Sequence, residues 1–109
     1  MAASKKVTVM GDFSIIPVGH GKTSVGKYVG EAVKAISKIK GIRYEITAMG
    51  TILETERLDT ILEAVKQAHE AVSNLGVQRI ESTLRIDDRR DKPRTLKDKI
   101  QAVKSHIQR

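Results

Sequence analysis

An α+β fold is predicted by the order and spacing of apolar residues in this 109-residue chain. Each half carries an alternating apolar and polar stretch, then an apolar stripe at helical spacing, then further alternating residues. The order is βαββαβ, followed by one more amphipathic segment. It is typical of the ferredoxin-like arrangement, in which two helices cover one face of a four-stranded antiparallel sheet. We expect residues 1–109 to form a single such domain with an extra C-terminal helix.

The first βαβ half is expected over residues 5–55. Residues 5–17 alternate as a strand, and Pro17 ends it. Ser24 is the expected N-cap of a helix that runs to about residue 40, where Gly41 supplies the stop. Residues 42–55 predict a hairpin around Met49 and Gly50. The hairpin residues expected to face the core are Tyr44, Ile46 and Ala48.

The second half follows the same plan. Thr60 and Glu63 fit a capping box, so a helix is predicted from there to a stop at Gly76. Residues 77–86 alternate as the fourth strand, and residues 87–94 form a charged turn. Residues 95–107 predict a last helix with a narrow apolar stripe: Leu96, Ile100, Val103 and Ile107.

No helix is expected to cover the second face of the sheet. Its residues are small and mixed in polarity: Thr8, Met10, Asp12, Ser14, Thr47, Met49 and Thr83. For the third strand, either Ile52, Glu54 and Glu56 or Thr51, Leu53 and Thr55 point to this side. Such a face favours a ligand or a partner subunit, and the extra helix offers a second contact surface. We therefore expect self-association.

Composition excludes several classes of protein. The chain has no cysteine, which removes disulfide scaffolds, thiolate metal sites and cysteine nucleophiles and fits a reducing cytoplasm. No run reaches the roughly 18 apolar residues of a membrane span, and Asp12 interrupts the only candidate signal segment. The net charge of +7 allows nucleic-acid or anion binding. Acids are mixed among the bases of residues 85–109, so a solvated, ion-paired surface is the favoured interpretation.

The segment PVGHGKTSVGKY, residues 17–28, resembles a nucleotide-binding loop. That loop needs a glycine five residues before the final Gly-Lys pair, where its backbone turns around the phosphates. This chain has Ile16 there, followed by Pro17, which has no N–H to donate. P-loop folds also require a parallel sheet, so we reject nucleotide hydrolysis. A weaker anion site remains open at the start of the helix, from Lys22, Thr23 and Ser24.

Other catalytic patterns are missing from the sequence. His20, His69 and His106 do not fall at metal-ligand spacing, and no serine has a predicted histidine–acid pair. The acids of IDDRRDKP, residues 86–93, have basic neighbours and fit a charge-paired turn better than acid–base catalysis. Stacking of RNA bases needs aromatic residues on the open face, and the chain has three aromatics in all. We expect no enzyme, no metal and no cofactor.

Three stretches resemble one family: DFSIIPVGHGKTSVGKYVGEAVK, GIRYEITAMGTILETE and RIDDRRDK. The resemblance extends over residues 7–104 and points to the thiamine-binding-protein family of small ferredoxin-like domains. That family is related to a YkoF-type protein that binds thiamine and hydroxymethylpyrimidine. The resemblance implies a non-enzymatic homotetramer, a dimer of dimers, with thiamine or its pyrimidine part bound near subunit interfaces.

The candidate ligand-binding residues combine this resemblance with the predicted open face. A carboxylate can accept from an aminopyrimidine or offset the thiazolium charge, and a methionine sulfur can pack on the ring. The set is Asp12, Ser14, Thr47, Met49, Thr51 and Glu54. Two alternatives stay open. One is a structural or regulatory oligomer that binds another ligand or an anion, and the other is a basic nucleic-acid-associated protein.

Overall fold

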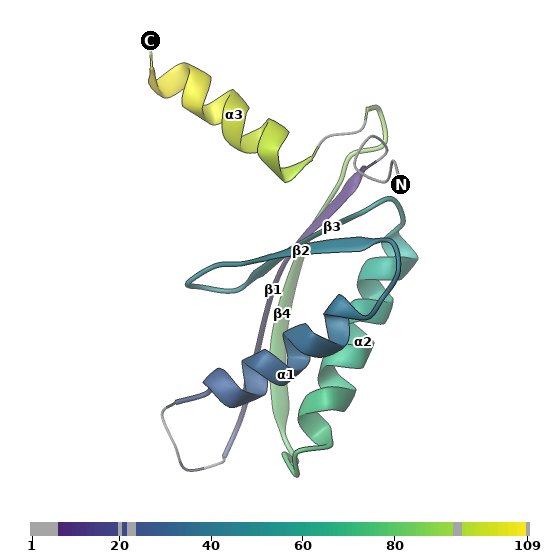
Figure 1. Cartoon of the computed structure of the whole chain (residues 1–109), viewed down its shortest axis with the longest axis vertical. Coiled ribbons are helices and arrows are strands. Elements are labelled where there is room, and N and C mark those ends of the chain that lie inside the picture. The colour runs from purple at the N-terminus through teal and green to yellow at the C-terminus, as the bar shows by residue number, and fades with distance from the viewer. Residues whose placement is uncertain (1–6, 20, 22–23, 93–94, 109) are drawn as a thin grey trace.

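A computed structural model describes residues 7–19, 21, 24–92 and 95–108 (Figure 1). Its four strands form one antiparallel sheet in the order β2-β3-β1-β4. This is the predicted ferredoxin-like arrangement, and its antiparallel pairing excludes the parallel sheet of a P-loop fold. The elements are β1 (Val9–Pro17), α1 (Gly26–Ser37), β2 (Ile42–Ile46), β3 (Thr51–Thr55), α2 (Leu58–Ser73), β4 (Ile80–Asp88) and α3 (Leu96–Ile107).

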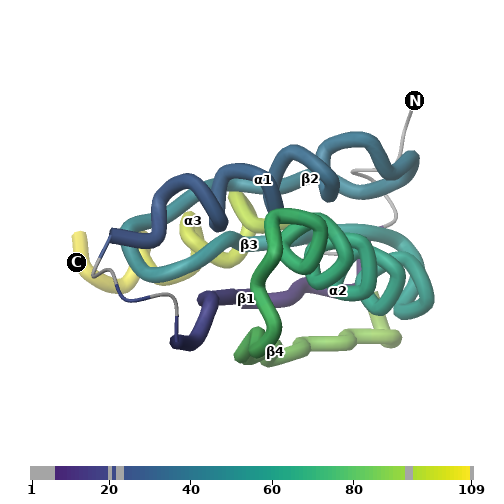
Figure 2. Tube along the Cα trace, turned by 90° about the horizontal axis from the view of Figure 1, so that it is seen from below, coloured from purple at the N-terminus to yellow at the C-terminus, as the bar shows by residue number. Residues whose placement is uncertain are grey.

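The strand register fixes which residues share a face. Phe13 of β1 lies opposite Thr51 of β3 and Leu84 of β4, and these side chains point toward α1 and α2. Asp12 lies opposite Ile52 and Arg85, on the other face. Figure 2 shows α1 and α2 on the same side of β1 and β4. We call the side without these two helices the open face.

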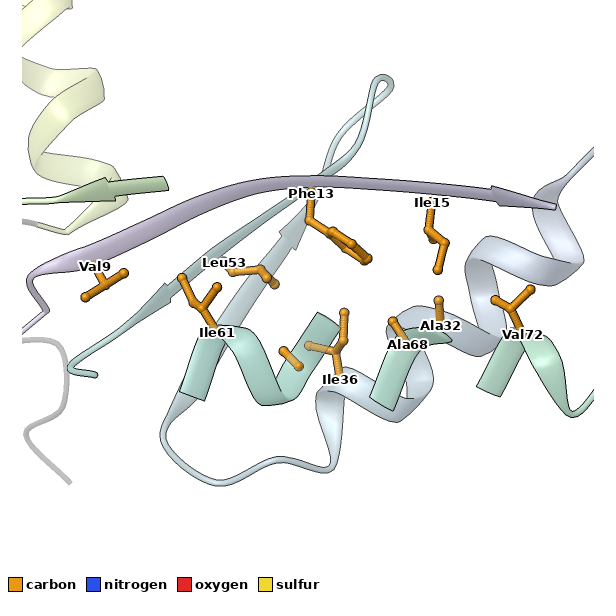
Figure 3. Close-up of a cluster of buried hydrophobic side chains, with 10 residues drawn as sticks. Val9, Phe13, Ile15, Ala32, Ile36, Leu53, Ile61, Ala68 and Val72 are labelled. Carbon is orange, nitrogen blue, oxygen red and sulfur yellow. The ribbon is translucent and has the colours of Figure 1, made fainter. Parts of the chain in front are cut away.

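The core forms between β1 and the two helices. Figure 3 shows Val9, Phe13 and Ile15 pointing from β1 toward Ile36 of α1 and Ala68 of α2. Each of these five side chains is at most 4% exposed. Burial of a large apolar side chain contributes about 1.5–3 kcal/mol. The alternation of apolar residues predicted this β1 face correctly.

Both predicted helix starts were wrong: the N-cap of α1 is Val25, one residue after the predicted Ser24, and that of α2 is Arg57, three residues before the predicted Thr60. The α1 helix begins at Gly26, because the carbonyl of Val25, not Ser24, accepts from Tyr28 N at 3.0 Å and Val29 N at 3.1 Å. The α2 helix begins at Leu58, so Thr60 lies inside its first turn. Leu58 packs against the core, and that burial outweighs the roughly 1 kcal/mol of a side-chain cap.

Three hairpin residues expected in the core are exposed. Tyr44 and Ile46 point to the helix side of the sheet but remain 43% and 64% exposed, because β2 is an edge strand that the helices cover only in part. Ala48 is exposed in the turn itself. At the other edge, β4 continues to Asp88, so two acids assigned to the charged turn belong to the strand.

The C-terminal helix projects from the rest of the molecule (Figure 1). None of its described residues is buried, and the radius of gyration is 15.2 Å, against about 13 Å for a compact chain of this length. Two contacts tie its first turn to the open face. Leu96 N donates to Glu54 Oε2 at 2.6 Å, and Lys99 pairs with Asp87. Within the described ranges, no helix is long and apolar enough to cross a membrane.

Candidate ligand-binding site

A cavity of about 220 Å3 lies between the β2–β3 turn, the second half of β1 and the first half of α1. Its wall contains no charged residue among the described part of the chain. The lining residues are Phe13, Ser14, Ile15, Ile16, Val25, Val29, Ala32, Val33, Ile46, Thr47, Ala48, Met49, Gly50 and Thr51. A concave, mostly apolar wall with a few polar groups is the usual form of a small-molecule site.

The β2–β3 turn is held by the hydroxyl of Thr47. This hydroxyl donates to Gly50 O at 2.8 Å and accepts from Gly50 N at 3.1 Å and Met49 N at 3.3 Å. Gly50 passes so close to β1 that a Cβ there would lie 2.9 Å from Phe13 O. Met49 is 89% exposed at the tip. Thr47 therefore shapes the turn, and Met49 is placed to cover the opening of the cavity.

Two hydroxyl-bearing residues of the predicted set lie farther inside the wall. Thr51 is only 3% exposed and lies on the helix side of β3, opposite Phe13. Ser14 belongs to the open face but also lines the cavity, beside the turn. Among the described residues, no hydrogen bond engages either hydroxyl. The Thr51 hydroxyl is thus available to a bound molecule at little cost to the fold.

The two predicted carboxylates lie outside this wall. Asp12 Oδ1 is 3.3 Å from the position of a Cβ on Gly50, which sets Asp12 close to the turn, and its Oδ2 lies 3.4 Å from Arg85 Nη2. Glu54 is 6% exposed and pairs with Arg43 Nε at 3.4 Å while it accepts from Leu96 N. Glu54 therefore anchors α3 on the open face, well separated in the sheet from the turn.

The predicted single site thus divides into two places. Ser14, Thr47, Met49 and Thr51 meet at the cavity, Asp12 lies near it, and Glu54 lies under α3. The expectation that Asp12, Ser14, Thr47 and Met49 share one sheet face was wrong, because Thr47 and Met49 leave the sheet at the turn. Thr51 and Glu54 point to opposite faces, since they are three positions apart on one strand.

The sequence interpretation missed the contribution of α1. Val25, Val29 and Val33 repeat at intervals of four, which places them on one side of the helix along the cavity. Ala32 lines the cavity and also packs in the core, as Ile36 does. The sequence did offer a signal for this wall. The apolar stripe of α1 is wider than packing against the core requires.

The other candidate groups do not form a site. Lys22 and Thr23 lie outside the described residues, and Ser24 is exposed and does not cap α1. Within the residues that the structure describes, no cluster of three or more histidine or carboxylate side chains could hold a metal ion. His69 Nε2 lies 2.7 Å from Ser82 Oγ, which satisfies that pair within the fold. The charged turn is ion-paired as predicted, with Arg89–Asp91 at 2.7 Å and Arg90–Asp88 at 2.9 Å.

Comparison with known proteins decides the family. The model of a family described as thiamine-binding protein matches residues 11–104. The chain belongs to this thiamine-binding protein family. A UPF0045 protein of Methanothermobacter thermautotrophicus is 50% identical over 91% of this chain and 99% of its own. The UPF0045 protein YqgV of Bacillus subtilis is 38% identical over 89% of this chain and 95% of its own.

Solved structures of similar proteins have the same fold. The MJ1052 protein of Methanocaldococcus jannaschii superposes with a TM-score of 0.79 at 45% identity, covering 88% of this chain and 95% of its own. The TM0486 protein of Thermotoga maritima, described in connection with thiamine biosynthesis or salvage, reaches 0.71 at 21% identity, covering 87% and 97%. The thiamine-binding protein family is described by a ligand rather than by a reaction.

Proposed function

We propose that this chain is a non-enzymatic small-ligand-binding protein that holds thiamine or its hydroxymethylpyrimidine part. Membership of the thiamine-binding protein family supports the ligand class. The observation that carries the location is the cavity beside the β2–β3 turn, whose described lining residues are uncharged and include four of the six predicted residues. The proposal includes a cytoplasmic location, in keeping with a chain that has no cysteine.

The cavity suits one ring better than the whole vitamin. Its volume of about 220 Å3 is below the roughly 300–1,000 Å3 of pockets for drug-sized ligands. A cation is costly to bury against a wall without a counter-charge. We therefore place the neutral aminopyrimidine inside, within reach of the Thr51 hydroxyl. The thiazolium ring of thiamine then stays at the opening, on the side of Asp12.

Self-association is the second part of the proposal. The family resemblance implies a homotetramer, and the chain has two uncovered surfaces that suit such an assembly. One is the open face of the sheet, and the other is the exposed apolar stripe of α3. In this proposal the ligand lies at or near a subunit interface, as the family resemblance implies, and the wall described above is the contribution of one chain.

Calorimetric titration with hydroxymethylpyrimidine and with thiamine tests the ligand. We expect saturable binding of one molecule per chain, and Thr51→Val should weaken it about tenfold, the cost of one hydrogen bond to a buried group. Thr55→Val is the matched control. Thr55 is another buried threonine of β3, but its hydroxyl donates to Gly41 O at 2.7 Å, away from the cavity. It should lower stability and leave affinity unchanged.

Two results would contradict the proposal. Absence of heat and of any thermal shift at millimolar concentrations of both compounds would remove thiamine and its pyrimidine as ligands. Equal loss of affinity in the two threonine variants would mean that the effect comes from the sheet and not from the cavity.

A further inference from the structure

Strand β1 is longer than one of its two neighbours. It pairs with β4 over all nine residues from Val9 to Pro17, but with β3 only from Val9 to Phe13. β3 begins at Thr51, opposite Phe13, because the chain before it belongs to the β2–β3 turn. Beyond Phe13, no described strand covers this side of β1. The uncovered stretch borders the cavity, whose wall includes Ile15.

The hydrogen bonds at the two ends of the β1–β4 pairing show which backbone groups face the uncovered side. Val18 N donates to Arg79 O at 2.8 Å, and Arg89 N donates to Thr8 O at 2.7 Å. Alternate residues of a strand direct their N–H and C=O groups to the same side. The even-numbered residues of β1 therefore bond to β4, and the odd-numbered ones face β3. Ile15 is the first odd-numbered residue beyond the end of β3.

Both backbone polar groups of Ile15 thus lie on the uncovered side. Among the described residues, no hydrogen bond reaches its N–H or its C=O. Ile15 is 4% exposed, with its side chain in the core (Figure 3), so these groups have little access to bulk water. Pro17, the next residue that faces this side, has no N–H to donate. In the described part of β1 beyond Phe13, Ile15 therefore provides the single donor on this side.

A buried backbone N–H without a partner is costly, and more than about 90% of such groups in folded proteins are paired. The cavity of about 220 Å3 is where a partner for Ile15 can lie. That partner is either a water molecule or a ligand. The backbone of Ile15 is thus a second polar feature of the cavity, besides the hydroxyl of Thr51.

The arrangement of these two groups specifies a class of ligand. The N–H and C=O of one extended residue point the same way and lie side by side. They match a planar group that has an acceptor and a donor on two atoms joined through one carbon, because both hydrogen bonds can then form together. A ring nitrogen next to an exocyclic amino group has this arrangement. The aminopyrimidine carries it, and the thiazolium ring of thiamine does not.

We propose that Ile15 binds the pyrimidine part of the ligand through its backbone. Its N–H donates to the ring nitrogen next to the amino group, and the amino group donates to its C=O. The ring then takes the place that a further residue of β3 would occupy beside β1. This inference rests on the proposed function and names the groups that select an amino-substituted ring inside the cavity.

NMR spectroscopy with isotope-labelled protein and isotope-labelled hydroxymethylpyrimidine tests the contact directly. A scalar coupling across the N–H···N hydrogen bond should link the amide nitrogen of Ile15 to one ring nitrogen. In the free protein, the amide hydrogen of Ile15 should exchange faster than that of Phe13, whose N–H faces Thr51 of β3. Bound hydroxymethylpyrimidine should remove this difference.

Replacement of one peptide N–H by an ester oxygen tests the contribution to affinity. At Ile15 this change removes an N–H that no described strand uses. It should weaken the binding of hydroxymethylpyrimidine about tenfold in calorimetry, with a small change in stability. The same replacement at Phe13 is the matched control, since that N–H faces β3, and it should lower stability and leave affinity unchanged. Each ester also weakens the preceding carbonyl, which faces β4 in both cases, so this effect cancels in the comparison.

The outcomes separate this inference from the proposed function. Saturable binding without a coupling to Ile15, or with equal affinity in the Ile15 ester and the parent protein, would overturn the inference and leave the proposed function standing. Equal loss of affinity in the Ile15 and Phe13 esters would also overturn it, because the loss would then come from the sheet. Absence of binding of both thiamine and hydroxymethylpyrimidine to the parent protein would overturn both.

Discussion

Asp91 and Arg89 form the best-aligned ion pair of the charged turn. Two bonds join them, Nε to Oδ1 at 2.7 Å and Nη2 to Oδ2 at 3.2 Å. The hydrogen bonds from Arg89 hold the pKa of Asp91 below its ordinary value of about 3.8. Desolvation opposes them, and the charge of Arg89 adds to the lowering. The pair therefore adds stability above that ordinary value, and loses it as the pH falls through the lower pKa of the folded state.

Arg89→Gln should raise the pKa of Asp91 toward its ordinary value, which an NMR titration of the side-chain carboxyl carbon measures. Salt at 1 M should raise it in the parent protein too, because exposed pairs are screened. An Asp91 pKa that is the same in the variant and the parent would show that the guanidinium is not the cause. The change in stability should be small, as for other exposed pairs.

Single residues also show which parts of the site could not be predicted from the sequence. Asp12 and Glu54 were expected to share one ligand site because either carboxylate could accept from an aminopyrimidine or offset the thiazolium charge. In the structure Glu54 instead anchors α3, since the backbone N–H of Leu96, 42 residues later, donates to its carboxylate. No local pattern reveals a contact over that separation. The sequence left open which face Thr51 occupies, and its position opposite Phe13 follows only from the register of β1 and β3.

Among the elements, the β2–β3 hairpin depends on a close approach at Gly50. A Cβ at this position would lie 2.9 Å from Phe13 O, a backbone atom that cannot move alone. Gly50→Ala should therefore shift the turn, lower the free energy of unfolding by about 1–3 kcal/mol and weaken ligand binding. Urea denaturation and calorimetry measure the two effects.

Gly30→Ala is the matched control for the hairpin. Gly30 is an exposed residue of α1, and a Cβ there would have no atom within 4 Å outside its own helix and immediate neighbours. Alanine in place of glycine inside a helix should stabilise the protein by about 0.5–1 kcal/mol. Equal effects of the two substitutions would mean that the close approach at Gly50 does not constrain the turn.

The elements themselves were predictable because periodicity reports burial. The alternation of β1 and the stripes of α1 and α2 all pack as the spacing indicates. The helix starts were less predictable, because burial of Leu58 counts for more than the capping preference of Thr60. Tyr44 and Ile46 alternate like core residues and yet stay exposed, since an edge strand extends beyond the helices that cover the sheet.

At the scale of the whole molecule, the proposed homotetramer needs two different interfaces. A two-fold contact joins the same surface of two chains and closes at a dimer. The second surface available is α3, which projects from the domain with Ile100, Val103 and Ile107 exposed by 43%, 59% and 74%. A capping box between Thr95 and Asp98 and the bond from Leu96 N to Glu54 fix where this helix starts. The stripe is thus presented in a defined position.

This assignment predicts how the assembly divides. Val103→Glu should leave dimers, because a buried charge in the α3 contact is costly. Sedimentation velocity at micromolar concentration measures the change from tetramer to dimer. Ser105→Glu carries the same charge on the opposite side of α3 and should remain a tetramer. A Val103→Glu protein that is still tetrameric would exclude α3 from the assembly, and the open face would then have to supply the second interface.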